Sequence, residues 1–97
     1  MSYEVDTADD SFNYTSNMAP FFKDFGAYPP SWDGKRAGDV AASIQTALLA
    51  IIDKSERELQ EYDSPNGWGD WLGAMAFLVR VRDSCRRNPG AEIRESH

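Results

Sequence analysis

Apolar residues recur at helical spacing in two long segments of the chain. Over residues 37–54, valine, isoleucine and leucine occupy positions 40, 44, 48 and 51. Residues three and four apart lie on one face of an α-helix, so this stripe predicts a helix with a buried side. A second stripe of the same spacing runs from Trp71 to Cys85, and the Asn-Pro-Gly sequence at 88–90 predicts its end.

Shorter segments alternate apolar and polar residues, as strands do. We interpret Phe12–Thr15 and Ala91–Glu95 as short strands, with a short helix over Met18–Phe25 that ends at Gly26. A two-stranded sheet is marginal alone, so these strands are expected to pair and to lie on the helices. The sequence predicts a small, helix-dominated α+β domain in the order β-α-α-β, with the N- and C-terminal strands paired in a small antiparallel sheet against two long helices.

Two boundaries of this domain need separate treatment. Residues 1–10 are acidic and lack apolar periodicity, so we expect a disordered leader there and a single domain over 11–97. Ser55 and Glu58 form an S-x-x-E pattern, which is typical of a helix start. Either a second helix begins at this point, or the pattern lies inside one long helix; the sequence leaves both open.

The segment before the second long helix has an unusual composition, with two tryptophans and two glycines. Proline stops the preceding element, asparagine and glycine tolerate the left-handed backbone of a turn, and aspartate accepts hydrogen bonds at a helix N-terminus. We therefore interpret the segment as a turn into a helix. The residues assigned to this structural turn are Pro65, Asn66, Gly67, Gly69 and Asp70.

Charge and residue content exclude several kinds of chemistry. The chain has 16 acidic and 10 basic residues, a formal net charge of −6, which argues against direct nucleic-acid binding. Its single histidine is His97 and its single cysteine, Cys85, lies on a predicted buried stripe. A nucleophile has no positioned base and zinc has no ligand set, so we expect no catalytic residue, no metal site and no cofactor. No stretch could cross a membrane and the first residues do not resemble a secretory signal, so we expect a cytoplasmic protein.

The remaining candidates are surface groups that could contact a partner. An acidic run follows the first long helix, and tryptophans are frequent at protein interfaces. A solvated helix face is the ordinary interpretation of such a run. The candidate partner-binding residues are Asp53, Glu56, Glu58, Glu61, Asp63, Trp32 and Trp68.

Two sequence blocks carry a resemblance to known proteins. They are Asn13-Tyr14-Thr15-Ser16-Asn17 and Pro65-Asn66-Gly67-Trp68-Gly69-Asp70. Together they resemble a group of small accessory proteins of bacteriophages and actinobacteria. The resemblance brings no catalytic residue to this chain. It implies a phage- or mobile-element-type protein.

These observations favour a small acidic protein-binding module that is not an enzyme. One form of this hypothesis is an inhibitor of a host nucleic-acid-handling defence complex, of the anti-CRISPR or DNA-mimic type, whose carboxylates occupy a basic channel. The first alternative is a homo-oligomeric structural or regulatory accessory protein. The second is a binder of divalent cations, or a small enzyme, that uses the same carboxylates. Monomer and homodimer both remain open.

Overall fold

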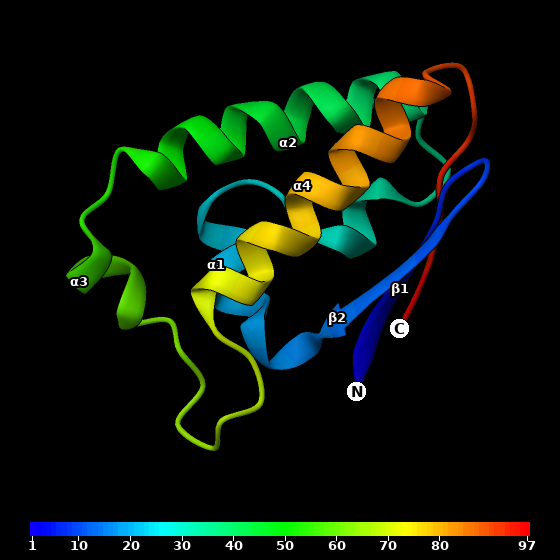
Figure 1. The fold of residues 1–97 in the computed structure, drawn as a ribbon. Coiled ribbons are helices and arrows are strands. Elements are labelled where there is room, and N and C mark those ends of the chain that lie inside the picture. Colours follow the sequence, from blue (N-terminus) through cyan, green and yellow to red (C-terminus); the bar gives the residue numbers. More distant parts are fainter.

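A computed structural model describes all residues 1–97, and it confirms the predicted α+β fold. The fold consists of four helices and a small antiparallel sheet, and both chain ends lie at that sheet (Figure 1). Two 3-10 turns, η1 and η2, flank the first helix. The elements are β1 (Ser2–Asp6), β2 (Ser11–Thr15), η1 (Ser16–Met18), α1 (Ala19–Asp24), η2 (Pro29–Trp32), α2 (Ala37–Ile52), α3 (Glu56–Gln60), α4 (Trp71–Arg87) and β3 (Arg94–Ser96).

The sheet has the order β2-β1-β3, so β1 is its central strand. The prediction of a disordered leader over residues 1–10 is therefore wrong for Ser2–Asp6. Tyr3 and Val5 alternate with polar residues and are buried, which gives β1 the apolar face that a strand needs. The predicted strand at residues 12–15 pairs with β1 and not with the C-terminal strand, which pairs with the other edge of β1.

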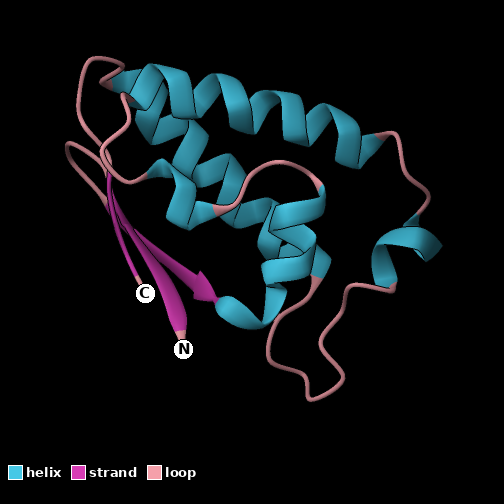
Figure 2. Ribbon diagram, turned by 180° about the vertical axis from the view of Figure 1, so that it is seen from behind, coloured by secondary structure: helices cyan, strands magenta, loops and turns pink.

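Helices α2 and α4 pack against each other, and the sheet lies to one side of them (Figure 2). Their predicted stripes are buried: Val40, Ile44 and Ile51 in α2, and Leu78 and Val81 in α4 are at most 1% exposed. All 21 buried hydrophobic residues form one cluster, so the chain has a single core.

The first turn of α2 is completed by backbone groups that follow α4. No side chain caps this helix. The amide of Ala37 donates to the carbonyl of Ala91 at 2.7 Å, and the amide of Gly38 donates to the carbonyl of Pro89 at 2.8 Å. These bonds satisfy amides that a helix start leaves free, and they fix the end of α4 against the beginning of α2.

The S-x-x-E pattern marks a separate short helix, which settles the alternative left open by the sequence. Helix α2 ends at Ile52 and α3 begins after Ser55. The Glu58 amide donates to Ser55 Oγ at 3.2 Å, and the Ser55 amide donates to Glu58 Oε1 at 3.3 Å. This reciprocal pair is a capping box.

No helix in the structure has the length and apolar character required to cross a membrane.

Candidate functional site

Helix α3 projects from the side of the molecule, with extended connections before and after it (Figures 1 and 2). We refer to residues 53–63 as the α3 segment. Leu59 anchors it and is 3% exposed, while the Tyr62 hydroxyl donates to Asp24 Oδ2 at 2.7 Å. The Tyr62 ring also meets Phe21 edge to face, with 5.4 Å between centroids. Leu59 and Tyr62 thus attach a largely exposed segment to the rest of the domain.

The predicted acidic run lies on this segment, but its five carboxylates differ in their hydrogen bonds and ion pairs. Glu58 belongs to the capping box, whose hydrogen bonds from Ser55 lower its pKa, and it pairs with Lys54 at 4.0 Å. Asp63 accepts a hydrogen bond from the Trp71 amide at 2.8 Å and so helps to start α4. The other three are exposed and take part in no hydrogen bond or ion pair; they are Asp53, Glu56 and Glu61.

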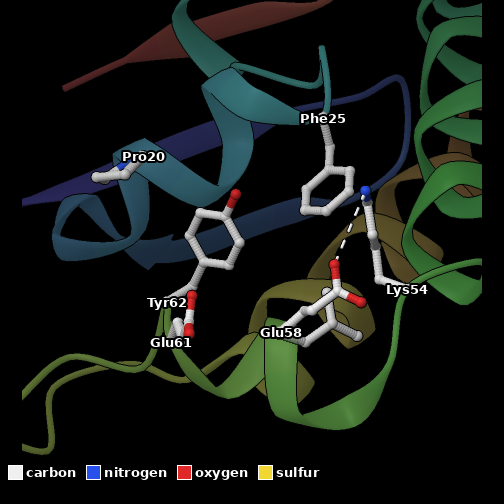
Figure 3. A pocket seen from close by; sticks show the side chains of 7 residues that line it. Pro20, Phe25, Lys54, Glu58, Glu61 and Tyr62 are labelled. Atoms are coloured by element: carbon white, nitrogen blue, oxygen red, sulfur yellow. Dashed lines mark ion pairs between the residues drawn. The ribbon is translucent and has the colours of Figure 1, made fainter.

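A cleft of about 450 Å³ separates the α3 segment from α1 (Figure 3). Phe25 and Tyr62 form its aromatic walls, and the Lys54–Glu58 pair lies at its side. The hydrogen bond to Asp24 raises the pKa of Tyr62 to about 12, so this phenol stays protonated as a donor.

A second cleft of about 390 Å³ lies on the opposite side of the α3 segment, toward α4. Ile52, Trp71 and Met75 contribute apolar surface to it, and Ile52 is 69% exposed. Glu56 lies at the same cleft. One of the free acids, Glu56, thus adjoins apolar surface together with Lys54, and such a mixture of charged and apolar groups is found at many protein interfaces.

The three tryptophans have different environments. Trp32 is 2% exposed, because the η2 turn directs its indole into the core, where it stacks on Phe77 with 6.4 Å between centroids. The structure therefore removes Trp32 from the candidate partner surface. Trp71 is half-buried at the start of α4, and Trp68 is 69% exposed.

The residues of the predicted turn into α4 have the structural roles expected of them. Gly67 and Gly69 have φ values of 78° and 113°, and Asp70 caps α4 by accepting a hydrogen bond from the Gly73 amide at 2.7 Å. Asn66 Oδ1 accepts from the Ser64 hydroxyl at 2.5 Å and from the Trp68 amide at 3.0 Å. Pro65 is exposed beside them.

This turn meets β2 and η1, so the two sequence blocks at residues 13–17 and 65–70 lie side by side. Tyr14 bonds to the backbone of Asp70, and Asn17 Nδ2 donates to the Trp68 carbonyl at 3.3 Å. A cleft of about 530 Å³ opens between the blocks, and we call it the Trp68 cleft. Its lining residues are Met1, Ser2, Asn13, Tyr14, Thr15, Asn17, Asn66 and Trp68. The sequence did not predict this site, because a local sequence pattern gives no sign of contact between residues about fifty positions apart.

The cysteine is buried in the core, and two arginines of α4 have acidic partners. Burial raises the pKa of the Cys85 thiol to about 11, and the side chain is fully buried. Arg82 pairs with Asp83, and Arg87 pairs with Asp10 at 2.7 Å. No group of three or more histidine, cysteine, aspartate or glutamate side chains is arranged to hold a metal ion.

Asp10 joins the tip of the β1–β2 hairpin to the end of α4. Its Oδ2 accepts hydrogen bonds from the Ser84 hydroxyl at 2.8 Å and from Arg87. Both bonds lower the pKa of Asp10, and the bond from Ser84 has the larger effect.

Searches against protein-family models, curated proteins and solved structures found no match.

Proposed function

We propose that this chain is a non-enzymatic protein-binding module that presents the α3 segment to a basic surface of its partner. The observation that supports this most directly is the grouping of Asp53, Glu56 and Glu61 on a projecting segment, where no cation of the chain pairs with them. Exposed charges of one sign raise the rate of encounter with a surface of the opposite sign. The apolar cleft beside Glu56 would supply buried contact area once the partner is docked.

The class of partner follows from the charge and from the resemblance of the two sequence blocks to phage accessory proteins. A protein that handles nucleic acid carries lysine and arginine along its binding channel. Carboxylates on a projecting segment compete for those cations. We therefore favour a host nucleic-acid-handling defence complex as the partner, with this chain acting as an inhibitor of the DNA-mimic or anti-CRISPR type in the host cytoplasm.

Two variants of equal charge test this proposal. D53K/E56K/E61K reverses the three free acids of the α3 segment, and E4K/D39K/E92K reverses three exposed acids elsewhere. Each triple variant changes the charge by +6 and brings the formal net charge from −6 to 0. Proteins captured from a host lysate by the unchanged chain are compared with those captured by each variant, in the presence and absence of duplex DNA.

The proposal predicts a captured protein that DNA displaces, that the first variant loses and that the second retains. Equal capture by both variants would show that the α3 segment is not the contact. Loss with both would indicate non-specific attraction by net charge.

A homo-oligomeric accessory role is the second candidate. Leu49, Ile52 and Leu72 are more than half exposed, and β2 and β3 are edge strands whose backbone groups are free on one side. Light scattering over a range of protein concentrations tests this role. A mass that stays at the monomer value counts against it.

The cation-binding alternative gains no support from the arrangement of the carboxylates.

A further inference from the structure

The Trp68 cleft has an uncharged side-chain lining in a strongly charged protein. No aspartate, glutamate, lysine, arginine or histidine lines it, although the chain carries 26 acidic and basic residues (16 + 10). None of these side chains offers an ionic partner to a ligand, and the charged group among the lining residues is the α-ammonium group of Met1. A volume of about 530 Å³ suits a small molecule.

Trp68 gives this cleft an aromatic surface on a fixed backbone. Its amide donates to Asn66 Oδ1 and its carbonyl accepts from Asn17 Nδ2, so the backbone is held on both sides. The side chain is nevertheless 69% exposed. An exposed indole on a backbone that is held in place is suited to stacking against a planar ring, an interaction that contributes strongly to the binding of nucleobases.

Asparagine side chains surround this indole and retain free hydrogen-bonding groups. Asn13 takes part in no side-chain hydrogen bond, and Asn17 uses only its Nδ2 and Asn66 only its Oδ1. An asparagine amide presents a donor beside an acceptor, which matches the paired groups on the edge of a base such as adenine. Proteins that recognise unpaired bases combine such edge contacts with aromatic stacking.

We propose that the Trp68 cleft binds the base of a nucleoside, with the base stacked on Trp68 and its edge bonded by the asparagine amides. This inference is independent of the proposed role of the α3 segment.

Titration of the full chain with adenosine, guanosine, cytidine and uridine, followed by amide chemical shifts, tests the proposal. We expect saturable shifts in both sequence blocks with at least one nucleoside. W68A should weaken binding by about fivefold or more, since stacking on an aromatic side chain contributes at least that factor. N13A removes an amide that has no structural role in the free protein and should also weaken binding. L72A, an exposed apolar change outside the cleft, is the matched control.

Three results would overturn the proposal: no nucleoside shifts the cleft residues, W68A binds as tightly as the unchanged chain, or methyl glycosides or tetramethylammonium bind as tightly as nucleosides. The D53K/E56K/E61K variant should bind nucleosides normally. Nucleoside binding by this variant distinguishes failure of the present proposal from failure of the proposal for the α3 segment, because the variant changes only the acidic surface.

Discussion

The hydroxyl of Tyr14 donates a hydrogen bond to the carbonyl of Asp70 and accepts one from the amide of the same residue, each at 3.1 Å. A single side chain of β2 thus fixes the residue that caps α4. The Tyr14 ring also stacks on Phe77 within α4, with 5.8 Å between centroids. Tyr14 thus joins the sheet to the beginning of the second long helix, as Asp10 joins the hairpin tip to its end.

Replacement of Tyr14 by phenylalanine should destabilise the protein by about 1 to 2 kcal/mol, because it removes both hydrogen bonds and keeps the ring. The free energy of unfolding in urea measures this change. N13A, on the same strand, removes an exposed side chain without a hydrogen bond and should change stability by less than about 0.5 kcal/mol. Equal stability of Y14F and the unchanged protein would contradict the role assigned to the hydroxyl.

The two glycines of the turn should respond differently to replacement by alanine. A Cβ at Gly69 would lie 2.6 Å from Thr15 Cγ2 and 2.9 Å from Met18 Cγ, whereas a Cβ at Gly67 would meet nothing within 4 Å. Both have positive φ, so G67A should cost about 1 kcal/mol from backbone strain alone. G69A adds a clash and should cost about 3 kcal/mol or more. Urea denaturation of the pair measures the difference, and equal losses would show that the turn does not pack on β2 and η1 as described.

Docking of the hairpin tip on α4 should weaken in acid. The pKa of Asp10 is lowered in the folded protein, so its contribution is fully present above the ordinary aspartate pKa of 3.8 and is lost as pH falls through the lower, folded value. D10N should therefore reduce stability at pH 7. The difference between D10N and the unchanged protein should shrink below pH 3.8, which urea midpoints across this range would detect. A difference that is constant with pH would exclude the carboxylate as its source.

Leu59 should stabilise the α3 segment against local unfolding, with little effect on the unfolding of the core. L59A removes the buried anchor of α3, and a loss of about 2 kcal/mol corresponds to amide exchange about thirtyfold faster in residues 56–60. Exchange in the middle of α2 and α4 should be unchanged. Hydrogen exchange resolved by residue measures both. L49A, which truncates an exposed leucine of α2, is the control, and uniform acceleration over all helices by L59A would show that α3 opens only with the whole domain.

The sequence was sufficient for elements whose stabilising contacts are local or periodic. The stripes through Ile44 and Leu78 predict α2 and α4 because burial follows helical spacing. The Ser55–Glu58 capping box and the Asp70 cap are also local, since donor and acceptor lie three residues apart.

Features that depend on distant contacts were missed or left open. β1 offers only Tyr3 and Val5 as apolar residues among acids, and its stability comes from pairing on both edges. Their alternation was the available signal, and it was too short to outweigh the acidic composition. The burial of Trp32 likewise depends on Phe77, 45 positions further along the chain (77 − 32), and the Trp68 cleft exists only where the two sequence blocks meet.

The bonds from the start of α2 to the chain beyond α4 also bear on how fast the protein folds. The amides of Ala37 and Gly38 find their acceptors about fifty residues later, and Glu4 of the central strand pairs with Ser96. Such pairings require the closure of long loops before any stabilising contact forms, which slows folding. A chain that is half helical should therefore fold more slowly than a helical bundle of its length, because its rate-limiting step brings together segments from the two halves of the sequence.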